Sequence, residues 1–282
     1  MWLICGHIPI KVKMSLLEYP FFQNALWGIL LISIVSALVG TYIVTRRMVF
    51  ISGGITHACF GGLGLGYFLG ISPMAMAAVF AVGGSLGVDW LASGRTRKDS
   101  AIAVVWALGM ALGILFVSLS EGNVPELNSF LFGNVLTISR IDLWLFFGFA
   151  LALLLIYMVL FPVIEMISFD QDFARTRHLP VKTINIMMTI FVSLGIVLTI
   201  KMIGIMLLMS LMSLPQMIAE RYARRYLPLM IFSGIISIFG CVGGLIISSY
   251  IAVPASASIV LLLIISYVLS SLFPSPAGRP RL

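Results

Sequence analysis

Residues 143–161 read LWLFFGFALALLLIYMVLF, a run of apolar side chains without a single charge. Its length is close to the roughly 20 residues with which an α-helix crosses the hydrocarbon core of a bilayer. The strands of a membrane β-barrel would alternate apolar with polar residues, and this run does not. Because lipid offers backbone amides no other partner, the run predicts a transmembrane α-helix.

The composition extends this prediction to the whole chain. Hydrophobic residues make up 61% of the 282 residues and charged residues only 10%, against about 25% charged residues in a typical soluble domain. This balance excludes a soluble enzyme, whose surface needs more polar groups. It also excludes a disordered chain, which needs low hydrophobicity. We therefore predict an all-α, polytopic membrane helix bundle in a lipid bilayer.

The apolar segments predict eight to nine transmembrane helices. The uncertain division is residues 184–219, which only Lys201 and Gly204 interrupt. At about 1.5 Å per residue, a straight helix of that length would far exceed a ~30 Å hydrocarbon core. We expect this stretch to turn back or break, with Lys201 at the turn. The nine candidate spans are Leu26–Val44, Ser52–Gly70, Met74–Ala92, Ala101–Leu119, Leu143–Ile164, Ile184–Ile200, Ile203–Ala219, Leu227–Ser248 and Ala255–Phe273.

The basic residues predict the topology. Thirteen of the 17 Lys and Arg residues form five clusters, each separated from the next by two predicted spans. All five then lie on one side, which the positive-inside rule makes cytoplasmic, with the N-terminus outside and the C-terminus inside. Nucleic-acid binding would require one continuous basic face, so no such partner is expected. The clusters are Arg46–Arg47, Arg95–Lys98, Arg175–Lys182, Arg221–Arg225 and Arg279–Arg281.

The chain is interpreted as one domain. Residues from Met14 onward, MSLLEYPFF, look like a natural start, so residues 1–13 are interpreted as an N-terminal extension and residues 14–282 as a single transmembrane domain. The three cysteines form neither a CxxC motif nor a zinc-binding spacing.

His57 is the ionisable residue that stands out within a predicted span, in GGITHACFGGLGLG, residues 53–66. Imidazole binds Mn, Fe, Zn, Ni and Cu, although a histidine in a helix bundle also serves simply as a hydrogen-bonding packing residue. The glycines around it let neighbouring helices approach closely. They suit a dimer seam, a pore wall or plain tight packing, and these readings stay open.

The longest polar loop is residues 168–182, SFDQDFARTRHLPVK. We expect Ser168 to cap a short helix whose first turn carries Asp170 and Asp172, which suits the helix dipole. Phe169, Phe173 and Ala174 would form its small apolar face. Such a protruding amphipathic helix can dock a partner, while a solvated connecting loop is the alternative.

The chain carries no ATP-hydrolysing domain and no catalytic motif. It contains no Gly-Lys dipeptide and therefore no phosphate-binding loop, and neither HExxH nor GxSxG occurs. We predict that it is not an enzyme.

Five ordered motifs resemble one family, the permease subunits of metal-type ATP-binding-cassette importers for zinc, manganese and iron, the ABC-3 family. The resemblance covers roughly residues 17–273, and its order makes it more specific than any single motif. The motifs are GTYIVTRRMVFISGGITHACFGG at 40–62, KDSAIA at 98–103, LFGNVLTIS at 131–139, FDQDFARTRHLPV at 169–181, and the segment 204–219 with Gly204, Pro215 and Ala219.

The chain also departs from the family pattern. In the family, an aspartate lies four residues before the histidine and the two line the metal path, but Gly53 stands there in this chain. Three alternatives follow: the ion differs, or Ser52, Thr56, Cys59 or another helix completes the path beside His57, or the ion passes with little coordination. Gly61 replaces the family proline, and His178 replaces a family glycine, while Gly62, Gly204 and Pro215 keep the family residues. Structural roles are assigned to Gly61, Gly62, Gly204 and Pro215.

The resemblance implies an ABC importer permease of the vitamin B12-importer type in a bacterial cytoplasmic (inner) membrane. It would form a homodimer, or a heterodimer with a sister permease. A cytoplasmic ATPase dimer would dock on residues 168–182, through Phe169, Asp170, Asp172, Ala174, His178 and Pro180. An extracytoplasmic metal-binding protein would deliver the divalent metal ion, which is cargo, and no stably bound cofactor is expected.

Two other classes remain. A single-chain secondary transporter or channel would need coupling carboxylates near the bilayer midplane, and the midspan regions carry none. An integral membrane enzyme would need a catalytic constellation that the sequence lacks.

Overall fold

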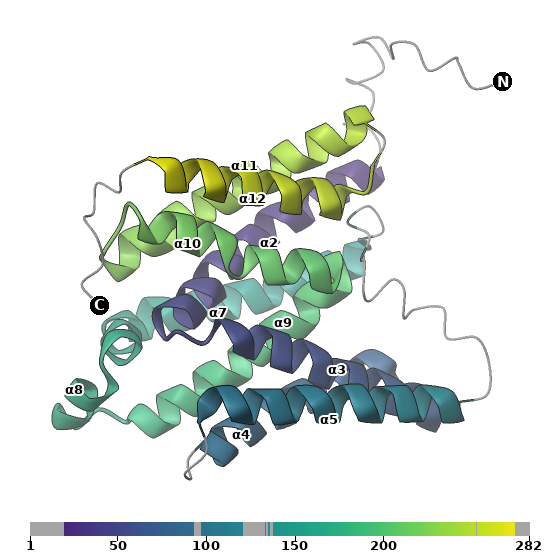
Figure 1. Cartoon of the computed structure of the whole chain (residues 1–282), viewed down its shortest axis with the longest axis horizontal. Helices are drawn as coiled ribbons and strands as arrows, with labels where there is room; N and C mark the ends of the chain where they lie inside the picture. Colours follow the sequence, from purple (N-terminus) through teal and green to yellow (C-terminus); the bar gives the residue numbers. More distant parts are fainter. Residues whose placement is uncertain are drawn as a thin grey trace.

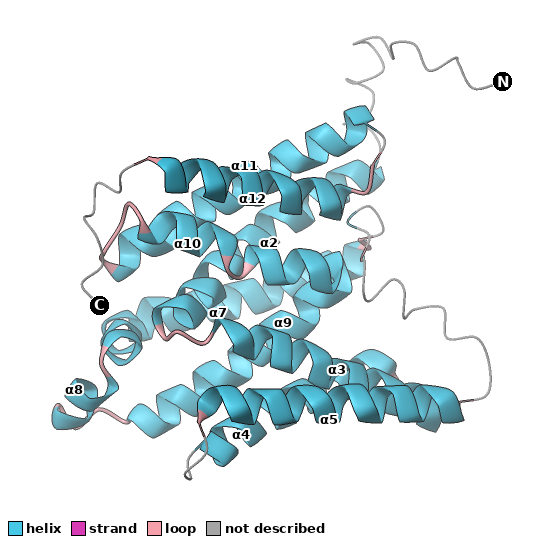
Figure 2. Cartoon of the chain, in the orientation of Figure 1, coloured by secondary structure: helices cyan, strands magenta, loops and turns pink. Residues whose placement is uncertain are grey.

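The computed structural model describes residues 20–92, 97–120, 133, 135, 138–251 and 253–273. Within these ranges the regular elements are helices and there is no strand (Figure 2). Two segments named in the sequence analysis, residues 1–13 and Arg279–Arg281, lie outside the described ranges. The helices are α2 (Pro20–Thr45), α3 (Val49–Leu69), α4 (Pro73–Ala92), α5 (Lys98–Leu119), α7 (Arg140–Phe169), α8 (Gln171–Thr176), α9 (Val181–Leu211), α10 (Leu214–Glu220), α11 (Tyr226–Ile251) and α12 (Ala255–Leu272).

Eight helical stretches in the described part are long and apolar enough to cross a membrane. The predicted sixth and seventh spans form one of them, the 40-residue stretch Val181–Glu220 that contains α9 and α10. The prediction of an all-α membrane bundle with eight to nine spans is therefore confirmed.

The helices lie in three groups, with α3, α4 and α5 on one side, α11 and α12 on the other, and α2, α7 and α9 between them (Figure 1). Helix α2 is central, and every residue from Val35 to Val44 is buried. A helix that is apolar all round is stable only when other helices cover it or lipid surrounds it.

Polar contacts tie α2 to its neighbours at mid-depth. The hydroxyl of Tyr157 on α7 donates to the carbonyl oxygen of Leu38 at 2.8 Å. The hydroxyl of Ser36 donates to the carbonyl oxygen of Leu211 at 2.5 Å. The buried side-chain amide of Gln216 donates to the carbonyl oxygen of Ser36 at 2.8 Å. In lipid such bonds hold helices together because the freed polar groups would find no water.

The chain reverses direction within α9. Asn185 accepts a hydrogen bond from Arg46 at the C-terminal end of α2, and Met202 lies beside Gly28 near its N-terminal end. Leu211, however, already contacts Ser36 again. The chain therefore runs up along α2 and back down, and the reversal is at Gly204, where φ is 77° and ψ is 172°.

This backbone conformation explains the position of the turn. The combination of positive φ with extended ψ is open essentially only to glycine. The prediction that the stretch turns back is confirmed, but the turn lies at Gly204 and not at Lys201. Lys201 instead forms an ion pair of 2.5 Å with Asp142 at the start of α7. We call this end of the bundle the Lys201 end, and the opposite end the α8 end.

Candidate functional site

His57 lies on the face of α3 that packs against α5. Its imidazole is half-buried and stacks on the indole of Trp106, with ring centroids 4.3 Å apart and planes inclined by 17°. Its Nδ1 lies 3.0 Å from the sulfur of Met110. The aromatic ring and the thioether thus orient the histidine from one side.

Gly53 lies one helical turn before His57 on the same face, as the spacing of four residues requires. A Cβ atom at this position would lie 2.9 Å from the indole of Trp106 and 3.3 Å from the methyl group of Met209. Trp106 therefore occupies the space into which a side chain at residue 53 would project. The structure leaves no room there for the carboxylate that the family pattern has.

The side chains of the other candidates for the metal path are buried, and their hydroxyl groups are already hydrogen-bonded within α3. The hydroxyl of Thr56 donates to the carbonyl oxygen of Ser52 within α3 at 2.6 Å, and Thr56 is fully buried. Cys59 is a fully buried free thiol. Ser52 donates to the carbonyl oxygen of Val49 at 2.6 Å and lies 3.5 Å from the sulfur of Met209. His57 is thus the one candidate of this group whose side chain is partly accessible.

No group of three or more His, Cys, Asp or Glu residues in the described part of the chain could hold a metal ion. A single copy therefore contributes one imidazole and not a complete set of protein ligands among the described residues.

The glycines of α3 let this helix pack closely against α4 and α5, which positions the face that carries His57. A Cβ on Gly61 would lie 3.0 Å from the carbonyl oxygen of Gly109 on α5, and one on Gly62 would lie 2.8 Å from the Cα of Ala77 on α4. Helix α3 is therefore pressed between α4 and α5 at backbone distance. Pro215, which is also buried, occupies the first turn of α10, where its missing N–H costs nothing.

Residues 168–182 do contain a short helix, α8, but its cap differs from the prediction. Asp170 is the N-cap and accepts from the backbone N–H groups of Asp172 and Phe173 at 3.0 and 2.9 Å. The prediction that Ser168 is the cap was wrong, because α7 continues beyond the apolar run to Phe169. Ser168 is buried within α7 and bonds to the carbonyl oxygen of Ile164.

The apolar face predicted for this segment is divided. Phe169 and Phe173 are 56% and 47% exposed, whereas Ala174 is fully buried in the core of the chain. Ala174 therefore does not offer its side chain to a partner, and the expectation that it does was wrong. Helix α8 protrudes at a corner of the bundle (Figure 1), so the two phenylalanines are accessible there.

His178 ends α8 in a left-handed conformation with φ of 56°. The N–H of His178 bonds to the carbonyl of Arg175 and that of Leu179 to the carbonyl of Ala174, which is the Schellman pattern. Its left-handed position favours glycine. Pro180 then caps α9, and the two caps fix the direction in which α8 leaves the bundle.

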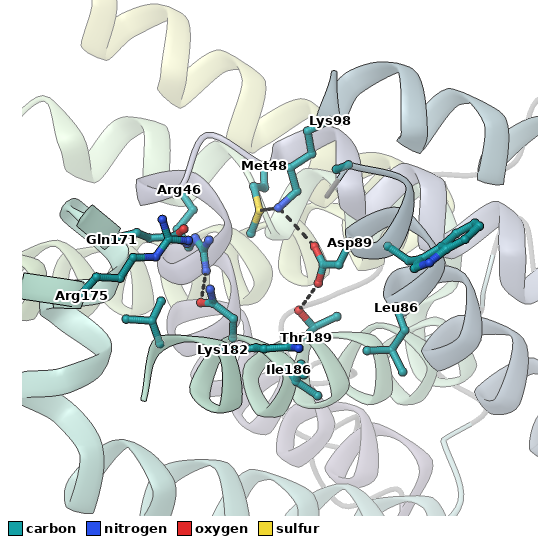
Figure 3. Close-up of a pocket in the computed structure, with 14 residues that line it drawn as sticks. Arg46, Met48, Leu86, Asp89, Lys98, Gln171, Arg175, Lys182, Ile186 and Thr189 are labelled. Carbon is teal, nitrogen blue, oxygen red and sulfur yellow. Dashed lines mark hydrogen bonds and ion pairs between the residues drawn. The ribbon is translucent and has the colours of Figure 1, made fainter. Parts of the chain in front are cut away.

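Charged residues far apart in sequence meet at the α8 end (Figure 3). Asp89 on α4 forms an ion pair of 3.5 Å with Lys98 on α5 and accepts from Thr189 on α9 at 3.1 Å. Arg46 donates to Asn185 at 2.6 Å. Three of the five basic clusters thus share one end of the bundle, as the spacing predicted. The sequence analysis missed the hydrogen bond between Thr189 and Asp89, because nothing in the sequence brings residues 89 and 189 together.

The model of the ABC 3 transport family matches residues 18–274, a range that includes every residue the structure describes. The chain belongs to the ABC 3 transport family. The resemblance inferred from the five motifs is thereby confirmed, and with it the expectation of a transport protein.

Individual members of the family and solved structures agree. An uncharacterized membrane protein of Synechocystis is 36% identical over 265 residues, which cover 94% of each chain. The manganese transport system membrane protein MntC of Halalkalibacterium halodurans is 28% identical over 94% of this chain and 91% of MntC. PsaBC from Streptococcus pneumoniae, in complex with Fab, superimposes with a TM-score of 0.84 and 26% identity, over 96% of this chain and 98% of that chain.

The fold extends to a more distant structure. A metal-chelate type ABC transporter in an inward-facing conformation superimposes with a TM-score of 0.74 at 15% identity, over 96% of this chain and 91% of that chain. The chain therefore has the fold of ABC transporter permeases.

Proposed function

We propose that this ABC 3 family chain is the membrane permease of an importer that carries a divalent transition metal ion into the cytoplasm. The observation that carries the proposal is the helix α8, which protrudes from an otherwise lipid-compatible bundle, with exposed Phe173 on α8 and exposed Phe169 at the preceding end of α7. A few anchoring side chains supply most of the binding energy at a partner surface, and aromatic residues are prominent among them.

The motor is a separate ATPase that docks on α8. The chain contains no phosphate-binding loop of its own, so ATP hydrolysis belongs to another subunit. The α8 end then faces the cytoplasm, in agreement with its concentration of arginine and lysine. The proposed location is a bacterial inner membrane, in line with the family of ABC transport permeases.

The ion path runs along the face of α3 that carries His57. Since one copy offers one imidazole, a second permease, identical or a sister chain, would supply the second side of the path. The proposed cargo is manganese, zinc or iron, since imidazole binds all three. Manganese is the first choice among them, because several relatives are manganese transport proteins. An extracytoplasmic metal-binding protein would deliver the ion at the Lys201 end.

Uptake into proteoliposomes tests the proposal. The permease is reconstituted with its ATPase and delivery protein, and radiolabelled manganese, zinc and iron are each measured with and without ATP. ATP-dependent accumulation of at least one ion, lost when the ATPase is omitted, is the expected result. Uptake by the permease alone, at the same rate without ATP, would instead establish a secondary transporter or channel.

A further inference from the structure

A cavity of about 700 Å³ opens at the α8 end of the bundle. Its walls come from the turn after α2, the ends of α4 and α8, and the starts of α5 and α9 (Figure 3). None of the candidate metal-path residues lines it. The cavity is therefore distinct from the candidate site around His57.

The cavity is strongly basic. Arg46, Lys98, Arg175 and Lys182 line it, and Asp89 is the one acidic lining residue. Asp89 is already paired with Lys98. The lining thus carries three cations more than it carries carboxylates.

Two of the remaining cations, Arg46 and Lys182, have no ion-pair partner among the described residues. Arg46 is held by neutral groups, the Tyr42 hydroxyl at 2.5 Å and the Asn185 amide oxygen at 2.6 Å. Arg175 pairs only with Asp172, which lies outside the cavity and is largely solvent-exposed. Lys182 forms no hydrogen bond or ion pair with any described residue. Such an arrangement is suited to an anion that the chain itself does not provide.

The N-termini of two long helices, α5 and α9, add to the attraction of the cavity for an anion. Lys98 is the first residue of α5, and Val181 and Lys182 are the first residues of α9, so both helices begin at the cavity wall. Helix N-termini carry unpaired N–H groups and a partial positive charge, which favour phosphate groups.

The rim on the α4 side is apolar and exposed. Trp90 is 75% exposed, and Leu86 and Ile186 line the cavity beside it. Tryptophan concentrates at the level of lipid headgroups, where its ring meets acyl chains and its N–H meets water. A ligand with a phosphate and an attached apolar part matches a basic floor beside such a rim.

We propose that this cavity binds the phosphate group of an anionic phospholipid from the cytoplasmic leaflet. The headgroup phosphate would lie between Arg46 and Lys182, with its acyl chains along Trp90. Because Arg175 belongs to α8, the lipid would help to hold the docking helix against the bundle. The inference rests on the proposed function only for the assignment of the α8 end to the cytoplasm.

The purified full chain in neutral detergent tests this. Short-chain phosphatidylglycerol, short-chain phosphatidylcholine and inorganic phosphate are titrated separately, and binding is followed by native mass spectrometry and thermal unfolding. Lys182→Gln is the test variant, since Lys182 is exposed and its removal breaks no bond. Arg140→Gln, which removes an exposed arginine at the Lys201 end, is the matched control.

Phosphatidylglycerol should bind more tightly than phosphatidylcholine and raise the unfolding temperature. Lys182→Gln should weaken it about fivefold, the usual contribution of one lysine near an anionic surface, and Arg140→Gln should leave it unchanged. Equal binding of both lipids, or equal weakening by both variants, would refute the proposal. Inorganic phosphate that binds as tightly as phosphatidylglycerol would make the ligand a free anion and refute the lipid.

A further outcome concerns protein partners. If Lys182→Gln leaves lipid binding intact but releases the ATPase, the cavity holds a carboxylate of that partner and the lipid proposal is wrong. Lipid binding is measured on the permease without metal or ATP. Its failure is therefore distinguishable from a failure of metal uptake.

Discussion

The indole of Trp106 lies flat on the imidazole of His57 and at the same time covers Gly53, one turn earlier on α3. An aromatic ring therefore fills the space beside residue 53, where the family resemblance leads one to expect a carboxylate. Introducing a carboxylate at residue 53 alone should fail.

Gly53→Asp should destabilise the protein by about 1–3 kcal/mol, the usual cost of overpacking a filled site. The double variant Gly53→Asp/Trp106→Ala should recover most of this loss, since removing the indole opens the space. Thermal unfolding of the four proteins in a double-mutant cycle measures the coupling between the two residues. Strictly additive effects would mean that Trp106 does not restrict residue 53. Gly83→Ala, at a position with open space around it, serves as the control for substituting a glycine.

His57 is predicted to line the ion path. His57→Gln keeps the approximate size and a hydrogen-bonding group but removes the imidazole, so ATP-dependent metal uptake should fall by about tenfold or more. Thr56→Val is the matched control, because the Thr56 hydroxyl is used within its own helix. If His57→Gln transports manganese, zinc and iron at the wild-type rate, His57 is a packing residue only.

Helix α8 offers a test that separates docking from folding. Phe173 is exposed, so Phe173→Ala should reduce ATPase co-purification about tenfold, as loss of an interface aromatic does, without lowering the unfolding temperature. Ala174→Leu should instead lower the unfolding temperature, because Ala174 is buried and overpacking there costs about 1–3 kcal/mol. Pull-down yield and thermal unfolding are measured on both variants. Wild-type ATPase retention by Phe173→Ala would place the docking surface elsewhere.

The C-terminal cap of α8 carries avoidable strain. His178 has the left-handed conformation, which costs a non-glycine residue roughly 1–2 kcal/mol. Glycine removes this strain but loses more backbone freedom on folding, so His178→Gly should stabilise the protein by a net of about 0.5–1 kcal/mol. His178→Val, with a β-branched side chain, should destabilise it. Thermal unfolding of both variants tests the prediction, and a lower stability for glycine than for histidine would contradict it.

The sequence predicted those features that depend on local composition. Long apolar runs identified the membrane helices, and the spacing of the basic residues placed Arg46, Lys98 and Lys182 at one end. The cap of α8 was misplaced, because the hydropathy pattern ends near Ile164 while the helix continues through Glu165 to Phe169. Hydropathy marks the limits of the lipid-compatible stretch and not the limits of the helix.

Contacts between distant residues could not be predicted in this way. Trp106 and Gly53 lie 53 residues apart, and their contact depends on the packing of α5 against α3. Ala174 looked like part of an exposed apolar face, since a single turn of helix has no periodicity to show which side is buried. The cavity at the α8 end needs five segments at once, and the charges that line it look in the sequence like ordinary loop residues.

The reversal of α9 supplies the last prediction. Gly204 adopts a conformation that residues other than glycine avoid. Gly133, with φ of 59°, lies against the backbone of this turn, so that a Cβ on Gly133 would collide with the carbonyl oxygen of Ile203. Gly204→Ala and Gly133→Ala should therefore each destabilise the protein by about 1–3 kcal/mol or more. Gly148→Ala in α7 is the matched control: a Cβ there meets open space, so alanine should be neutral or stabilising by up to about 1 kcal/mol. The yield of monodisperse protein and its unfolding temperature are the measurements. If Gly204→Ala behaves like Gly148→Ala, the stretch Val181–Glu220 does not turn back at residue 204.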